Sequence, residues 1–317
     1  MTVKEYADKI IENVKRVIQG KDEEITVVVS ALLAGGNILL EDVPGTGKTM
    51  LARALAKSLD CDFKRIQFTP DLLPSDITGI HFFNVKEQEF KLRKGPVFTN
   101  LLLADEINRA TPRTQSALLE CMEEKQTTID GEELQMPLPF IVIATQNPIE
   151  ISGTFPLPEA QLDRFMIRLS LGYPPREQER EVLNAIGAEH PIDSLGTAVS
   201  GKDLTDMQRQ AANIDVNGAV SDYILDIGEA VRDHADVAMG ISTRGLIALK
   251  RMSQGIAAVR GGGFVTPDDV QKAAKYVIPH RLICRRTVRE KGIDPAKKLI
   301  EEIISNVEVP TETIDMS

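Results

Sequence analysis

The sequence predicts an α/β protein, in which a parallel sheet covered by helices is followed by a smaller helical domain. In the first half of the chain, short apolar runs alternate with helical patterns, as expected for strands that are buried on both faces. These runs are residues 37–40, 63–68, 101–104 and 140–144. After residue 173 helical patterns dominate, and no strand is expected there.

The length of 317 residues predicts two domains, because one hydrophobic core rarely supports so long a chain. Tyr173 precedes a pair of prolines that marks the expected boundary, with residues 1–173 in the first domain and 174–317 in the second. An amphipathic helix is expected over residues 1–19, with Gly20 as its stop. The helical patterns of the second domain lie at residues 176–186, 204–212, 222–234, 244–259 and 267–277.

Two segments of the first domain have the pattern of inserted hairpins. Residues 80–92 alternate at both ends around a polar middle, which is typical of two strands and a turn. Asp130 and Gly131, within residues 127–136, form the usual two-residue hairpin turn. Both hairpins are expected to be exposed arms. The inserts that carry them span about residues 70–96 and 126–138.

Composition and charge exclude several classes of protein. The chain is 42% hydrophobic and 26% charged, so neither disorder nor a fibrous repeat is expected. Its longest apolar stretch, residues 27–40, is interrupted by polar residues and is shorter than the roughly 20 residues of a membrane span. We expect no membrane insertion and, because no signal-peptide core is evident, a cytoplasmic location. The net charge of −10 disfavours nucleic-acid binding, although it does not exclude local basic surfaces.

The strongest chemical signal is a strand, a glycine-rich loop and a helix start, LLEDVPGTGKT at residues 39–49. Such a loop surrounds phosphates with backbone N–H groups, and it predicts a site for ATP and Mg²⁺ in which Lys48 reaches the terminal phosphates and Thr49 binds the metal. Asp42 replaces the first glycine of the usual pattern, but aspartate tolerates turn geometries. A simple glycine turn is the alternative. The residues expected to hold the nucleotide are Pro44, Gly45, Thr46, Gly47, Lys48, Thr49 and Met50.

A second motif ends an apolar run with two adjacent carboxylates, Asp105 and Glu106. A core does not accept such groups unless they face a site. Asp105 would hold Mg²⁺ through water, and Glu106 would activate the attacking water as general base. A helix N-cap after a strand is the alternative interpretation. The loop and the carboxylate pair together predict an ATP hydrolase, and a GTPase is less favoured because no Asn-Lys-x-Asp motif occurs.

Three more polar residues are candidates for the site. Asn147 follows an apolar run and could hydrogen-bond the γ-phosphate or orient the water, although an asparagine before proline also favours a turn. Arg164 follows an expected short helix, and Arg244 opens a helix of the second domain. An arginine fork suits phosphate recognition, but most arginines are solvated surface groups.

These motifs resemble the MoxR family of AAA+ ATPases. The resemblance runs from residue 17 to residue 281, and it rests on ADEINRA (104–110), PRTQSALLE (112–120), ATQNP (144–148) and GTFPLPEAQLDRF (153–165). It implies a P-loop NTPase core of the αβα type with a C-terminal all-helical lid. Asn147 would be the sensor-1 residue, Arg164 the arginine finger offered to a neighbouring subunit, and Arg244 the sensor-2 arginine of the same subunit. The residues implied near the adenine are Val17, Ile18 and Gly20.

The same resemblance identifies the two hairpins as the helix-2 and pre-sensor-1 inserts of this AAA+ branch. It places Asp42 at a variable loop position. Ser242 and Thr243 stand where serine and proline are commoner, which leaves Arg244 in place. Arg109 and Arg113 remain further candidates for a neighbour's site.

An arginine that serves a neighbour requires a head-to-tail interface, and such interfaces either close into rings or continue into filaments. We therefore expect a homo-oligomeric ring, with six subunits, whose hydrolysis cycle moves the lid and arms and remodels a client protein. The resemblance implies clients with a von Willebrand factor A domain among its partners. Two alternatives stay open: a nucleic-acid-stimulated motor, and an ATP-gated scaffold with little turnover. The basic residues of the first arm that favour the motor are Lys86, Lys91, Arg93 and Lys94.

Overall fold

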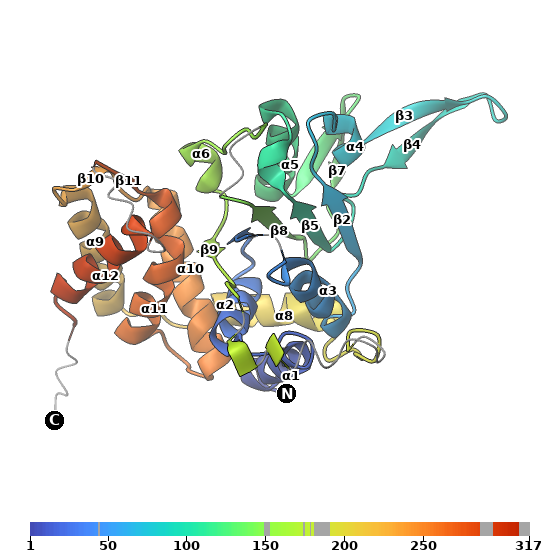
Figure 1. Cartoon of the computed structure of the whole chain (residues 1–317). Coiled ribbons are helices and arrows are strands. Elements are labelled where there is room, and N and C mark those ends of the chain that lie inside the picture. Colours follow the sequence, from blue (N-terminus) through green and yellow to red (C-terminus); the bar gives the residue numbers. More distant parts are fainter. Residues whose placement is uncertain are drawn as a thin grey trace.

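The computed structural model describes residues 1–43, 45–148, 153–173, 175–177, 179–180, 191–285 and 294–310. A sheet domain lies beside a group of helices, and a two-stranded arm extends away from the sheet domain (Figure 1). None of the helices in these ranges has both the length and the apolar character that a membrane span requires.

Within the described residues, five parallel strands form the central sheet in the order β2-β5-β8-β1-β9. Their bounds are β1 (Ile38–Glu41), β2 (Phe63–Gln67), β5 (Leu101–Asp105), β8 (Ile141–Gln146) and β9 (Ile167–Leu169). The first four confirm the strands predicted from the apolar runs. β9 is not predicted, because three residues are too few to show a pattern.

Helices cover both faces of this sheet, which explains the continuous apolar runs of its strands. Leu101 and Leu103 of β5 enter one apolar layer, whereas Leu102 and Ala104 enter the other. The first layer includes α1 (Val3–Lys15), α2 (Asp22–Leu33) and α3 (Lys48–Ser58). The second includes α4 (Pro74–Thr78) and α5 (Pro112–Glu124).

The first helix is shorter than predicted, because α1 ends at Lys15 rather than continuing to residue 19. The N–H groups of Val17 and Ile18 both donate to the carbonyl oxygen of Val14, at 2.9 Å each, so the chain turns here. Gly20 has a φ of 68°, a left-handed conformation that favours glycine. Gly20 therefore belongs to a turn after the helix and does not cap it.

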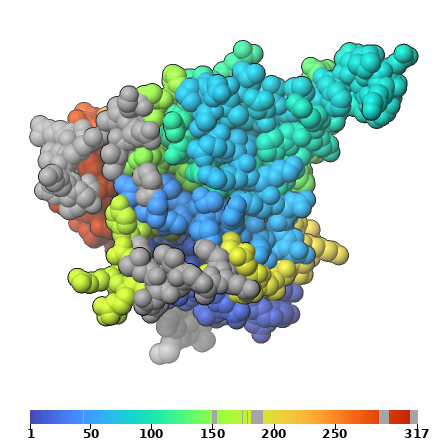
Figure 2. All heavy atoms as spheres, turned by 45° about the vertical axis from the view of Figure 1, so that its right-hand side comes forward, coloured from blue at the N-terminus to red at the C-terminus, as the bar shows by residue number. Residues whose placement is uncertain are grey.

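Both predicted hairpins are confirmed. The first consists of β3 (Gly79–Asn84) and β4 (Glu89–Lys94), and the second of β6 (Gln126–Ile129) and β7 (Glu132–Gln135). Asp130 and Gly131 have φ angles of 50° and 88°, as the tight hairpin turn requires. The two hairpins touch where Nδ1 of His81 lies 2.9 Å from Oδ2 of Asp130. Figure 2 shows the β3–β4 arm, in cyan at the upper right, standing clear of the body of the molecule.

The C-terminal part is mainly helical, as predicted. Its long helices are α8 (Gly201–Ala212), α9 (Gly218–Asp233), α10 (Thr243–Arg260), α11 (Pro267–Val277) and α12 (Pro295–Asn306). The expectation of no strand there is wrong, since β10 (Val237–Met239) pairs antiparallel with β11 (Ile283–Cys284). These strands are too short to be recognised in the sequence. Most of the helix expected at residues 176–186 lies outside the described residues. The short helices are η1 (Ile107–Arg109), α6 (Glu159–Leu162) and η2 (Pro279–Arg281).

The helical part packs directly on the sheet domain. A Cβ atom on Gly255 of α10 would lie 2.3 Å from the carbonyl oxygen of Ser30 in α2, so the close approach of these helices depends on glycine. Gln208 of α8 donates to the carbonyl oxygen of Leu32 at 2.8 Å. α8 therefore contacts the sheet domain, although it follows the predicted boundary after residue 173.

Candidate active site

The phosphate-binding loop of the sequence motif joins β1 to α3. Gly45 and Gly47 have φ angles of 85° and 87°, which residues with a side chain adopt only with strain. α3 begins at Lys48, so the positive end of its dipole lies at the loop. Lys48 Nζ donates to the carbonyl oxygen of Asp42 at 2.7 Å. Pro44, which the sequence also predicts to bind nucleotide, lies outside the described residues.

A pocket of about 200 Å³ opens on this loop. The ends of β5 and β8 form its other walls, because the carboxyl ends of parallel strands meet at one edge of a sheet. It is lined by Gly45, Thr46, Gly47, Lys48, Thr49, Met50, Asp105, Glu106 and Asn147. The structure therefore brings together the predicted phosphate, metal, general-base and sensor-1 residues.

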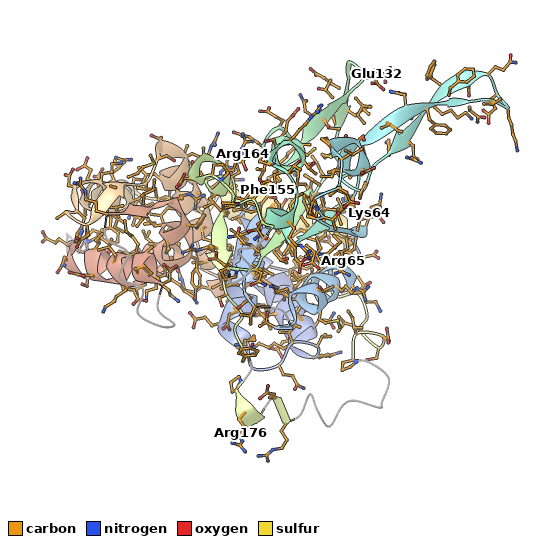
Figure 3. All side chains as sticks on the ribbon, turned by 45° about the horizontal axis from the view of Figure 1, so that its top comes forward. Lys64, Arg65, Glu132, Phe155, Arg164 and Arg176 are labelled. Carbon is orange, nitrogen blue, oxygen red and sulfur yellow. The ribbon has the colours of Figure 1, made fainter. Side chains whose placement is uncertain are left out.

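Both carboxylate oxygens of Asp105 are held by neighbouring side chains. The hydroxyl of Thr145 donates to Oδ1 at 2.6 Å, and Nη2 of Arg65 donates to Oδ2 at 2.7 Å. Arg65 lies on β2, beside β5 in the sheet (Figure 3). Sequence reasoning did not assign Arg65 or Thr145 to the site, because their proximity to Asp105 follows from the strand order.

Glu106 has a left-handed backbone, with φ 55° and ψ 49°, which costs roughly 1–3 kcal/mol for a residue other than glycine. Its N–H donates to the hydroxyl of Thr145 at 2.8 Å. Its Oε2 accepts from Nε2 of Gln67 at 2.8 Å and from Nη1 of Arg109 at 3.0 Å. Arg109, considered from sequence for a neighbour's site, thus contacts a carboxylate of its own chain. Gln67 is a further residue that the sequence did not indicate.

The electrostatic environment of Lys48 contains opposing contributions. Burial is the largest and lowers the pKa of its ammonium group from the ordinary value. The carboxylates of Asp42, Asp105 and Glu106 act in the opposite direction and favour the charged form. A bound polyphosphate would add further negative charge and would favour the protonated form of Lys48. The positively charged ammonium group is then suited to bind phosphate.

The residues expected near the adenine lie on the turn that follows α1. A Cβ atom on Gly47 would lie 3.9 Å from Cδ1 of Ile18, so this side chain is beside the phosphate loop. Val17 is half-buried against the core that contains α3. Val17, Ile18 and Gly20 are not among the described residues that line the pocket itself.

The two predicted phosphate-sensing arginines lie together, away from Lys48. Arg164 Nη1 lies 2.5 Å from Oε2 of Glu123 and donates to the carbonyl oxygen of Leu119 at 2.9 Å. Arg244 Nη2 pairs with the other oxygen, Oε1, of the same Glu123. Both arginines line a second pocket, of about 230 Å³. Figure 3 shows Arg164 on the part of the sheet domain nearest the lid, away from Arg65 on β2.

Arg244 does not lie beside Lys48 of its own chain in this structure, and its sensor-2 role stays a prediction. α10 packs on α2, and its first residue follows Ser242, whose hydroxyl donates to Oδ2 of Asp163 at 3.0 Å. This contact holds the start of α10 beside Arg164 rather than over the phosphate loop.

The donor set of the first pocket fits a magnesium ion bound together with a nucleotide. Thr49 and Asp105 supply a hydroxyl and a carboxylate, and Mg²⁺ commonly takes few protein oxygens and completes its shell with phosphate and water. In the described parts of the chain, no group of three or more His, Cys, Asp or Glu side chains could hold a metal by itself. Phosphate oxygens would therefore be needed for tight binding.

Comparisons with known proteins agree with this geometry. Residues 37–167 match the model of the ATPase family associated with various cellular activities (AAA), and residues 229–303 match the AAA lid domain. The chain is 39% identical to "Chaperone MoxR1" of Mycobacterium tuberculosis, over 96% of this chain and 82% of the relative. The chain belongs to the MoxR family of AAA+ ATPases.

Two other relatives extend the comparison along the whole chain. The protein YeaC of Bacillus subtilis is 47% identical, over 96% of this chain and 95% of its own length. A crystal structure of a protein from Cytophaga hutchinsonii superposes with a TM-score of 0.88 at 37% identity, covering 96% of each chain. The parallel sheet with its helical lid is therefore the fold of this MoxR-family chain and of that solved relative.

Proposed function

We propose that this MoxR-family chain hydrolyses ATP in the cytoplasm and uses the cycle of binding and hydrolysis to remodel client proteins. The observation that carries the proposal is the single pocket shared by Lys48, Thr49, Asp105, Glu106 and Asn147. A phosphate loop alone would suit many nucleotide-binding proteins, whereas a loop combined with a carboxylate positioned to activate water is suited to hydrolysis.

Each residue has a distinct role in this mechanism. The loop N–H groups and Lys48 bind the phosphates, and Thr49 with Asp105 would hold Mg²⁺, which neutralises phosphate charge when bound. Glu106 accepts the proton of the attacking water, and its contacts with Gln67 and Arg109 fix the direction of its carboxylate. Val17, Ile18 and Gly20 form the side nearest the adenine, and Asn147 orients the water or the γ-phosphate.

Arg164 and Arg244 act on the nucleotide of a neighbouring subunit. Their shared contact with Glu123 supports this role, because two guanidinium groups brought to one carboxylate are also spaced to grip one phosphate. An arginine pair on one face and a phosphate loop on another require a head-to-tail interface. The assembly we propose is a closed ring of six copies.

The β3–β4 arm is the element we assign to client contact. Phe83 and Phe90 are 50% and 72% exposed near its end, and Val85 is 79% exposed. Apolar side chains on a protruding arm suit the transient binding of apolar segments of another protein. The name of the relative "Chaperone MoxR1" supports a chaperone-like role, and the client class we propose includes proteins with a von Willebrand factor A domain.

The general-base assignment is tested with Glu106→Gln. We expect the rate of phosphate release at saturating ATP to fall by about 10²–10⁴-fold, because the amide cannot accept the proton of water. ATP affinity, measured by calorimetry, should change by less than about threefold, since Lys48 and Thr49 remain. Turnover at the wild-type rate would show that Glu106 is not the base.

The wild-type protein separates the proposed function from its two alternatives. ATP binding without measurable turnover, with and without client, would favour the nucleotide-gated scaffold. Stimulation of turnover by DNA at low salt, lost at high salt, would favour the nucleic-acid motor.

A further inference from the structure

Asp42 is a buried carboxylate at the loop position where the usual phosphate-binding pattern has glycine. It is 5% exposed. Its Oδ1 accepts from the hydroxyl of Ser170 at 2.7 Å and from the N–H of Gly172 at 3.1 Å. Its Oδ2 accepts from the N–H of Leu171 at 2.5 Å. The side chain is therefore fully engaged with one segment, residues 170–172, and a glycine could make none of these contacts.

That segment follows β9 and carries the chain out of the central sheet. At its end, the carbonyl oxygen of Tyr173 accepts from Nζ of Lys21 at 3.0 Å. Lys21 directly follows Gly20, in the turn that we propose lies near the adenine. Residues 170–173 are thus hydrogen-bonded at their start to Asp42 of the phosphate loop and at their end to Lys21.

The backbone of Asp42 makes two further contacts with the site. Its N–H donates to the carbonyl oxygen of Gln146 at 3.2 Å, at the end of β8. Its carbonyl oxygen accepts from Nζ of Lys48 at 2.7 Å. A single residue therefore joins the lysine of the phosphate loop, the end of a central strand and the segment that leaves β9.

We propose that Asp42 is a positioning residue, which fixes the phosphate loop against residues 170–173 and so sets the affinity of the site for ATP. This inference rests on the proposed nucleotide site. Asp105 and Glu106 are held by other side chains, among them Arg65, Thr145 and Gln67. Loss of the Asp42 carboxylate therefore affects the binding of ATP and leaves the hydrolytic groups in place.

The test is Asp42→Gly, which restores the usual glycine to the motif. It leaves the buried N–H of Leu171, the half-buried N–H of Gly172 and the hydroxyl of Ser170 without their acceptor, and the loop loses its attachment to residues 170–172. With the full-length protein we expect KM and the calorimetric Kd for ATP with Mg²⁺ to rise about tenfold, and kcat to stay within about threefold. An unchanged Kd would overturn the inference.

A merely structural role gives a different result. If Asp42 only stabilised the fold, an inactive fraction would lower kcat and the calorimetric stoichiometry, whereas KM and Kd of the active fraction would stay at wild-type values. Asp42→Asn is the second variant if the glycine variant does not fold. Its amide oxygen can still accept from Ser170 and Gly172, but its NH₂ group would face the N–H of Leu171, so we expect an intermediate Kd.

Two matched variants complete the experiment. Ser170→Ala removes one of the three hydrogen bonds to the carboxylate of Asp42 and should raise Kd by less than Asp42→Gly does. Glu41→Gln removes the neighbouring negative charge, which pairs with Arg168, and should leave Kd unchanged. If wild-type protein binds ATP without hydrolysing it, the proposed function fails, and the Kd series still decides the role of Asp42.

Discussion

The orientation of Glu106 depends on contacts that lie outside its own motif. Its left-handed backbone turns the residue at the end of β5, and its carboxylate meets Gln67 from the adjacent strand and Arg109 from the helix that follows. Strained backbone is often found where an active site needs one side chain in one direction. The carboxylate proposed as the general base is therefore positioned by the neighbouring strand as well as by the strand that ends in the carboxylate pair.

Gln67→Ala tests this positioning at the scale of one residue. The variant removes one of the two donors to Oε2 of Glu106. The free energy that holds this carboxylate in its orientation then falls by about 1 kcal/mol. We expect kcat to fall about fivefold, with KM for ATP unchanged because the phosphate loop is not touched. Steady-state kinetics of phosphate release measures both constants.

Lys64→Ala is the control on the same strand. Nζ of Lys64 donates to the carbonyl oxygen of Phe98 at 3.1 Å, and Figure 3 shows this residue on β2 with Arg65. Both kinetic constants should stay at the wild-type values. A Gln67→Ala variant with wild-type kcat would mean that Arg109 alone suffices to orient Glu106.

At the scale of elements, the sequence predicts those that are long enough to show a period or that contain a characteristic turn. The four longer strands of the sheet and both hairpins belong to this class, and Asp130 with Gly131 marks one turn directly. β9, β10 and β11 have three, three and two residues, so they depend on pairing with neighbours and leave no pattern. The end of α1 at Lys15 is set by a turn that packing stabilises.

The residues of the candidate site also fall into those that a local motif predicts and those that only the fold brings together. Lys48, Thr49, Asp105 and Glu106 belong to local motifs, and the structure brings all four to one pocket. The contacts of Arg65 and Gln67 follow from the order of the strands, which the sequence does not reveal. The position of Arg244 follows from the packing of α10 on α2, two helices more than 200 residues apart in the chain.

The β3–β4 arm gives the prediction that belongs to an element. Phe83 and Phe90 form a cross-strand pair with ring centroids 5.3 Å apart, and both remain exposed. With casein as an unfolded probe, we expect the wild-type ATPase rate to rise. The variant carrying Phe83→Ser and Phe90→Ser should lose this stimulation and keep its basal rate within about twofold, because the arm extends away from the sheet domain (Figure 1) and does not line the pocket.

A matched aromatic residue outside the arm controls for the loss of exposed apolar surface. Phe264, in the helical part, is 51% exposed. Phe264→Ser should retain both the basal rate and the stimulation by casein. If casein still fully stimulated the arm variant, the arm would not be the element that contacts the client.

At the scale of the whole molecule, the lid is fixed to the sheet domain of its own chain near the two arginines. Arg281 is almost fully buried, and its guanidinium donates to Oδ1 of Asp163 at 2.7 Å and to the carbonyl oxygen of Phe165 at 2.6 Å. Asp163 also accepts from Ser242 at the start of α10. These hydrogen bonds join the segment that carries Arg164 to the start of the helix that carries Arg244.

This arrangement predicts the outcome of mixing inactive chains. A Lys48→Ala chain lacks a phosphate site but retains Arg164 and Arg244, whereas an Arg244→Ala chain retains the site. If Arg244 serves the neighbour, an equal mixture assembled together regains activity, since roughly a quarter of head-to-tail interfaces join an intact site to an intact arginine.

Arg164→Ala mixed with Lys48→Ala should be rescued in the same way. Glu106→Gln with Lys48→Ala should not, because both changes damage the same site. The Arg244→Ala mixture could instead stay inactive while the Arg164→Ala mixture recovers. Arg244 would then act on the nucleotide bound by its own chain, and the lid would have to move over that pocket during the cycle.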